Sequence, residues 1–225
     1  MTINASTAPG DIQGTSIVLV GPCDPAMLQP SALLKNGLIS ETDVATLRYE
    51  MLVAEVAVAR LSWAQIVVER GKLSVTTTLE SPAGEPIRDF VLSFVELLPT
   101  RRFTALGINR EQHFGVPNEE HWHKIGHALV PKEPVWNNIL KKPGMSSLTV
   151  QGERSDGFAG QINVRIEPSK ELKPGVFVHI NDHYDVAPQA TNEEPDKLLD
   201  LLSAGWDDAM RRSDEIISKL KEISQ

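Results

Sequence analysis

All six histidines of the chain lie between His113 and His183, and histidine is the residue type best suited to bind a metal ion or move a proton near pH 7. Four of them fall within residues 113–127, and the other two are His179 and His183. Such a cluster is where catalytic chemistry would be sought first. It forms a site only if the elements that carry the histidines bring their side chains together.

Residues 118–130 are predicted to form a helix in which His123 and His127 lie one turn apart, away from the apolar stripe. Two histidines at this spacing bind zinc when a third ligand arrives from elsewhere in the fold. Lys124 stands where a metalloprotease helix carries a glutamate directly after its first histidine. We therefore expect a solvated helix face, and a zinc site at His123 and His127 is the alternative.

His179 and His183 are four positions apart on a predicted strand, which separates them by about 13 Å if the strand is straight. They can share a metal only if the chain turns at Asn181-Asp182, a dipeptide that favours turns. A compact site made of these four residues is therefore an alternative to an ordinary strand end at His183.

The strands predicted in the second half of the chain have one polar face, because alternate residues of a strand point to opposite sides. This face combines amide, imidazole and guanidinium groups with one aromatic ring. Its candidate binding residues are Asn109, His113, Arg165, Phe177, His179, Asn181 and His183. An antiparallel sheet can leave such a face in water, which is the simplest interpretation. The functional interpretation is a platform for a ligand or partner, and it requires the strand of His113 to lie beside the strand of His179.

The opposite face of the same strands is apolar and is predicted to form the core. Its residues are Leu106, Ile108, Leu148, Val150, Ile162, Val164, Ile166, Val176, Val178 and Ile180. Arg110 also falls on this face, which indicates either a change of register near Gly107 or a position beyond the edge of the core.

The predicted elements follow the order strand, helix, three strands, helix, and this order occurs twice if residues 53–60 form a strand. The other strands are predicted at residues 16–20, 63–70, 73–79, 102–114, 147–154, 161–167 and 176–183, and the helices at 30–37, 86–98, 118–130 and 193–222. We expect an α+β fold with antiparallel sheet and helices on one face. Residues 1–15 are expected to be flexible, and residues 16–225 to form a single domain. Residues 16–99 and 100–225 would be its pseudo-repeated halves, related by a twofold axis, and a domain without a repeat is the alternative.

The helix predicted at residues 193–222 would be about 45 Å long. Its first part is expected to pack on the sheet. Ordinary core packing is also expected for its last part, DEIISKLKEIS; the alternative is that this part projects and supports self-association.

Composition excludes several classes of protein. The net charge of −8 over 225 residues argues against general nucleic-acid binding, which needs a basic surface. No apolar run approaches the roughly 20 residues of a spanning helix, so we expect no membrane association. The N-terminus lacks the basic start and apolar stretch of a signal peptide, and we expect a cytoplasmic bacterial protein.

Familiar catalytic motifs are absent from the sequence. It contains no Gly-x-Ser-x-Gly elbow, no phosphate-binding glycine loop and no dinucleotide fingerprint, so we assign no catalytic residue and no cofactor. The single cysteine, Cys23, excludes an internal disulfide, and with no histidine nearby in sequence it is expected to be structural.

The runs LLPTRRFTALGINREQHF, GQINVRIEPS and GVFVHINDHYDV are similar to segments of a sporadically distributed family of uncharacterised bacterial proteins. The resemblance covers residues 90–186 and rests on a short motif. It implies an α+β fold, and it implies no catalytic residue because the family has no established activity.

Three functional hypotheses follow. The first is a non-catalytic binding or assembly protein that has a protein partner and belongs to a homo-oligomer or a larger complex. The second is a metal-dependent hydrolase that uses His123 and His127, or His179 and His183. The third is a sensor that holds a small ligand on the sheet.

Overall fold

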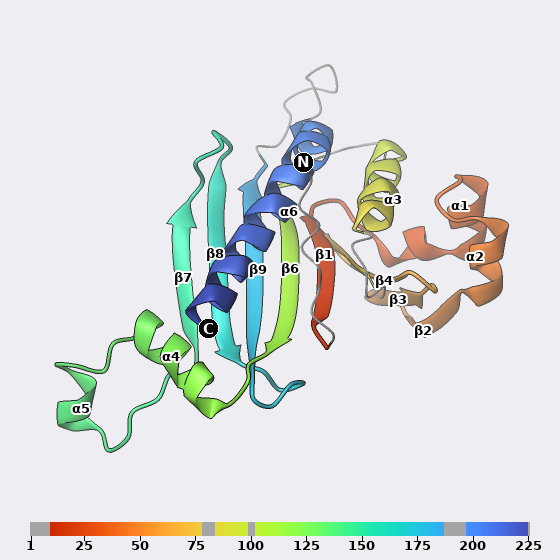
Figure 1. The fold of residues 1–225 in the computed structure, drawn as a ribbon. Helices are drawn as coiled ribbons and strands as arrows, with labels where there is room; N and C mark the ends of the chain where they lie inside the picture. Colours follow the sequence, from red (N-terminus) through yellow and green to blue (C-terminus); the bar gives the residue numbers. More distant parts are fainter. Residues whose placement is uncertain (1–9, 78–83, 99–101, 187–196, 225) are drawn as a thin grey trace, which may run out of the picture.

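The computed structural model describes residues 10–77, 84–98, 102–186 and 197–224. Within them, nine strands form one antiparallel sheet in the order β2-β3-β4-β5-β1-β6-β9-β8-β7 (Figure 1). The strands are β1 (Ile12–Val20), β2 (Arg48–Leu52), β3 (Val56–Arg60), β4 (Ala64–Glu69), β5 (Lys72–Thr77), β6 (Ala105–Gly115), β7 (Leu148–Glu153), β8 (Gly160–Pro168) and β9 (Gly175–Asp185). The predicted α+β class with an antiparallel sheet is confirmed.

The helices of the described residues cover one face of this sheet. They are the 3₁₀ helix η1 (Pro25–Leu28), α1 (Pro30–Lys35), α2 (Glu41–Thr46), α3 (Glu85–Glu96), α4 (Glu119–Leu129), α5 (Trp136–Ile139) and α6 (Lys197–Ile223). Helix α6 runs diagonally across β9 and β6, whereas α1 and α2 lie at the other end of the sheet (Figure 1). The opposite face carries no helix from the described part of the chain, and we call it the helix-free face.

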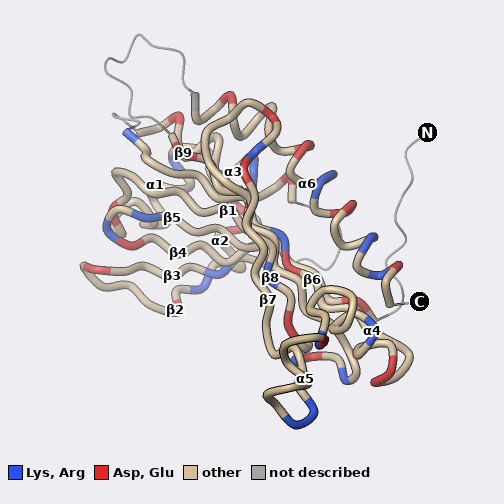
Figure 2. Tube along the Cα trace, turned by 90° about the vertical axis from the view of Figure 1, so that its left-hand side faces the viewer, with Lys and Arg blue, Asp and Glu red and all other residues tan. Residues whose placement is uncertain are grey.

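The sheet has two arms that follow the same order outward from its centre. Strands β1 and β6 pair at the centre; β5, β4 and β3 follow on one side, and β9, β8 and β7 follow on the other. Each arm is followed in the chain by a helix, α3 or α6. This is the order expected of two pseudo-repeated halves in one continuous sheet, with β2 as an addition to the first arm. The sheet twists strongly, so the strands of the two arms run in different directions in Figure 2.

Local chemistry explains several element ends. Gly71, with φ of +83°, makes the tight turn between β4 and β5, and Gly37, with φ of +69°, follows the end of α1. At the start of α4, the side chain of Asn118 accepts a hydrogen bond from the backbone N–H of His121. These ends lie where turn and capping residues predict them.

The N-terminal boundary was predicted wrongly in part. Strand β1 begins at Ile12, because residues 12–15 pair with β6, so the expected flexible segment does not reach residue 15. Residues 1–9 and 193–196, and the predicted strand end at 78–79, lie outside the described residues. The last part of α6 packs on the sheet as expected and does not project, since Ile217 and Leu220 are buried. A nine-stranded sheet is wide enough for the whole helix to lie across it.

The core consists of two clusters on the helix-covered face. The first joins the β1–β5 arm to α3 and the first half of α6, and the second lies under α4 and the last turns of α6. Of the predicted core residues on β7 and β8, only Ile166 is buried. Leu148, Ile162 and Val164 are partly exposed where they pack against the second cluster, and Val150 is 52% exposed. No described helix is both long and apolar enough to cross a membrane.

Candidate functional site

The strand that carries His113 pairs directly with the strand that carries His179. Strands β6 and β9 are antiparallel neighbours, and their register places His113 opposite Phe177 and Glu111 opposite His179. The condition for a shared polar surface is therefore met. Strand β8 continues it on the other side of β9, with Arg165 opposite His179.

All seven predicted candidate residues lie on the helix-free face of three adjacent strands, and we call this surface the polar face. They are Asn109 and His113 on β6, Phe177, His179, Asn181 and His183 on β9, and Arg165 on β8. The structure thus brings together the set that strand alternation assigned to one side.

A row of asparagines crosses the middle of the polar face. Asn163 donates a hydrogen bond to the amide oxygen of Asn181 at 3.3 Å, and Asn181 donates to the amide oxygen of Asn109 at 2.7 Å. Asn109 in turn donates to the hydroxyl of Ser16 on β1 at 3.2 Å. This chain of amides ties four strands together and holds the side chains of the row in fixed orientations. Gly107 supports it, because a Cβ there would lie 3.2 Å from Nδ2 of Asn181.

The row beside the asparagines places charged side chains on both sides of the His179 imidazole. His179 Nε2 lies 3.8 Å from Glu111 Oε1 on β6, and Arg165 stands opposite His179 on β8. Burial lowers the pKa of His179 below its ordinary value, because the charged ring loses water contact; Glu111 opposes this shift and Arg165 adds to it. His179 is therefore a neutral hydrogen-bonding group at pH 7.

The aromatic end of the polar face is a stack of planar groups. The rings of His113 and Phe177 are 4.6 Å apart, and the Arg165 guanidinium lies 5.5 Å from the Phe177 ring centre. His113 Nδ1 is 2.9 Å from the hydroxyl of Ser169, which accepts hydrogen bonds from the backbone N–H groups of Glu171 and Leu172. The Ser169 hydroxyl therefore donates its proton to His113 Nδ1, and neutral His113 carries its own proton on Nε2.

The compact four-residue site considered for β9 does not form. The strand continues regularly from Gly175 to Asp185, paired on both sides, so the chain does not turn at Asn181-Asp182. His183 contacts Asp185 instead, at 3.2 Å between Nε2 and Oδ1. His179 and His183 share the polar face without converging.

The histidines of α4 lie apart from the polar face. His121 contacts the side chain of Asn118 at 2.7 Å, and His123 and His127 are exposed, as a solvated helix face predicts. Among the described residues, no group of three or more His, Cys, Asp or Glu side chains is placed to hold a metal ion. His123 does line an open cleft of about 540 Å³ between α4 and the β8–β9 turn, together with Trp122 and Lys173.

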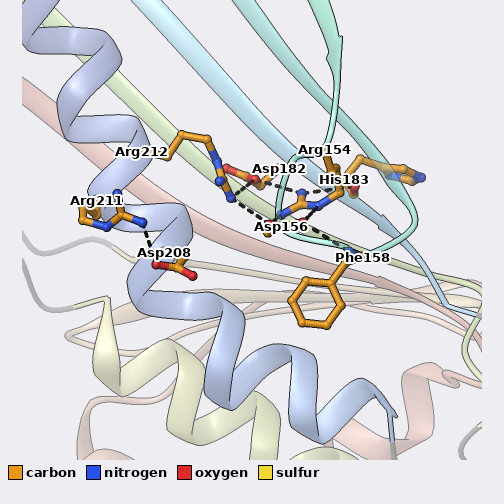
Figure 3. A network of polar contacts seen from close by, with 8 residues as sticks. All are labelled: Arg154, Asp156, Phe158, Asp182, His183, Asp208, Arg211 and Arg212. Carbon is orange, nitrogen blue, oxygen red and sulfur yellow. Dashed lines mark hydrogen bonds and ion pairs between the residues drawn. The ribbon is translucent and has the colours of Figure 1, made fainter.

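A buried ion network was not predicted from the sequence. Arg154 pairs with Asp156 and with Asp182, the latter at 2.9 Å, and Arg212 on α6 reaches Asp182 at 2.9 Å (Figure 3). The Arg154 guanidinium also stacks on Tyr184 at 3.6 Å from the ring centre. This network lies on the helix-covered face and fastens α6 to β9. The signal in the sequence was Asp182 itself, which interrupts the apolar alternation between Ile180 and Tyr184.

Arg110 belongs to the same polar band between the two core clusters. It donates hydrogen bonds to Thr15 and Gln13 on β1, and it lies 3.8 Å from Asp214 on α6. The register does not change at Gly107, so that expectation was wrong, whereas Arg110 does lie outside the core, between its two clusters. Cys23 is buried, which raises the pKa of its thiol to about 11.

No family model matches this chain, and no curated protein matches it. The family resemblance of residues 90–186 therefore stays a prediction.

Proposed function

We propose that this protein is a non-catalytic, cytoplasmic binding protein that holds a polypeptide partner on the polar face. The observation that carries the proposal is the convergence of seven polar and aromatic residues on the helix-free side of β6, β9 and β8. Hydrogen bonds hold the side chains of Asn109, Asn181, His113 and His183 in place before any partner arrives, and this lowers the entropic cost of binding.

The chemistry of the polar face favours a polypeptide over other partners. Phe177, flanked by His113 and Arg165, offers an aromatic anchor beside a guanidinium, and such groups are enriched in protein interfaces. The asparagine row adds amides, which pair well with backbone groups. Glu167 lies beside Arg165 and Glu111 lies beside His179, and Lys and Arg are interspersed with Asp and Glu along the chain in Figure 2. These carboxylates would repel the phosphates of a nucleic acid, so a nucleic-acid partner is disfavoured.

The proposal is tested by affinity capture from the cells that make the protein, with three versions of the chain. The double variant Arg165→Ala, Phe177→Ala removes the guanidinium and the ring. The control Arg211→Ala removes an exposed guanidinium from α6, on the other side of the sheet. We expect one stoichiometric polypeptide with the unchanged chain and the control, and its loss with the double variant. Equal recovery with all three would overturn the proposal.

A metal analysis separates this proposal from the hydrolase hypothesis. We expect protein purified without a histidine tag to carry no stoichiometric zinc, manganese or iron. One equivalent of any of these metals, lost together with hydrolytic activity in a His123→Ala or His179→Ala variant, would favour the hydrolase.

A further inference from the structure

The outer edge of β7 is an unpaired strand edge. Every residue of β7 except Leu148 is exposed, on both faces of the strand. Figure 1 places β7 at the end of the sheet, and no other described element lies along its outer side. The outward backbone N–H and C=O groups therefore form a template on which another strand can add.

The two edges of the sheet differ in how well they are protected against the addition of another strand. At the β2 edge the register with β3 shifts between Tyr49 and Met51, and Arg48 and Glu50 place charges along the strand. Strand β7 pairs with β8 without any shift, contains no proline, lysine or arginine, and has its one charge at its last residue, Glu153. Bulges and charges are the usual devices that prevent strand addition, and β7 lacks both along its central part.

The helix-covered side of the same edge is apolar and incompletely covered. Val150 is 52% exposed, and Leu148, Ile162 and Val164 are partly exposed on the side that elsewhere forms the core. In Figure 1, helix α6 crosses β6 and β9 and its last turns lie over β8, while Val150 on β7 stays half-exposed. The α5 segment, which precedes β7 in the chain, adds further exposed apolar side chains, with Ile139 at 71%. The edge thus combines free backbone groups with uncovered apolar surface.

We propose that β7 pairs antiparallel with β7 of a second copy of this chain, so that two nine-stranded sheets join into one. The strand is self-complementary in this arrangement. A register centred on Val150 places Val150 opposite its own copy, Thr149 opposite Gln151, and Glu153 opposite Ser147. No like charges face each other, the apolar strip continues across the axis, and the helices of both copies lie on the same side. This interface is separate from the polar face. The proposed dimer therefore does not depend on the function proposed for the polar face.

Sedimentation equilibrium over a range of micromolar concentrations tests the pairing. We expect the unchanged full-length chain to be a dimer. Val150→Lys, at an exposed position, should weaken the dimer at least about a hundredfold, because it places two ammonium groups opposite each other. The control Met51→Lys changes an equally exposed residue at the β2 edge and should leave the dimer intact. A monomeric unchanged chain, or equal weakening by both variants, would overturn the proposal.

Amide hydrogen exchange provides a readout that needs no variant. In the dimer, the outward amides of β7 should be protected at high concentration and should exchange faster on dilution, whereas β2 amides should not respond. Fast, concentration-independent exchange along β7 would contradict the pairing even if Val150→Lys failed to fold.

Discussion

Oδ1 of Asp182 on β9 accepts a hydrogen bond from Arg212 on α6 at 2.9 Å, where the Asp182 side chain is 1% exposed. The same oxygen accepts from Arg154, also at 2.9 Å. Asp182 and Asp156, each in contact with both guanidinium groups, therefore balance the two positive charges between the sheet and the helix. Removing one partner of such a buried group leaves the other charges without compensation.

Replacing Asp182 should accordingly destabilise the fold. We expect Asp182→Ala to lower the free energy of unfolding by about 3–5 kcal/mol, measured by urea denaturation. Asp208→Ala, which breaks the exposed pair with Arg211 on the same helix, should cost only a small fraction of that, because water screens the pair. Losses of equal size would mean that the buried network does not fasten α6 to the sheet.

Breaking the asparagine row should lower the stability of the fold by less than the loss of Asp182. Asn181→Ala removes one donor and one acceptor at once and leaves the amides of Asn109 and Asn163 without this partner. We expect a loss of about 1–3 kcal/mol in unfolding free energy. Asn36→Ala, at an exposed asparagine at the end of α1, is the matched control and should have little effect. An Asn181→Ala protein as stable as the unchanged chain would argue against a hydrogen-bonded row.

His179 predicts a pH dependence with a definite sign. Its folded pKa lies below the ordinary value of 6.5, mainly because of burial, so the unfolded chain takes up the proton first as the pH falls. The His179 contribution to stability is complete above about pH 6.5 and is lost between that value and the folded pKa. We expect His179→Gln to reduce this loss in unfolding curves measured between pH 7 and pH 5. A steeper loss of stability with falling pH in the variant would contradict a lowered pKa of His179.

The neighbours of His179 should move its pKa in opposite directions. Glu111→Gln removes a carboxylate that raises this pKa and should lower it further, whereas Arg165→Ala removes a cation that lowers it and should raise it. Titration of the His179 ring protons by NMR measures both shifts. Shifts of the same direction in both variants would contradict the cross-strand contacts.

Cys23 should be inert in the folded protein. Its thiol is buried and its pKa is raised to about 11, so almost none of it is thiolate at pH 8. We expect an aromatic disulfide reagent to react with Cys23 only when urea unfolds the chain. Rapid reaction in native buffer would show that the thiol is accessible.

Strand alternation was sufficient to predict the polar face, because the side-chain period of a strand is local. It assigned Asn109, His113 and His179 to one side without any knowledge of the neighbouring strands. That β6 lies beside β9 could not be derived, because strand order depends on contacts between distant parts of the chain. The ion network was missed for the same reason: Asp182 interrupts the apolar alternation of its strand, but its partner Arg212 can be identified only once α6 is placed on the sheet.

The error at Val150 has a tertiary origin. Alternation alone predicted that Val150 would be buried, whereas it is 52% exposed. The outcome depends on how much of the sheet the helices cover: the last turns of α6 pack with residues of β6, β8 and β9, and Val150 on β7 stays open. Coverage of a sheet is a tertiary property that periodicity does not contain.

Site-specific photocrosslinking in the producing cells tests the binding role of the polar face most directly. A photoreactive phenylalanine analogue in place of Phe177 should crosslink to one polypeptide partner, whereas the same analogue in place of Arg211, on the exposed side of α6, should not. A partner crosslinked only from position 177 is the predicted result. No crosslink from position 177, or the same crosslinks from both positions, would contradict the assignment of the polar face as a binding surface.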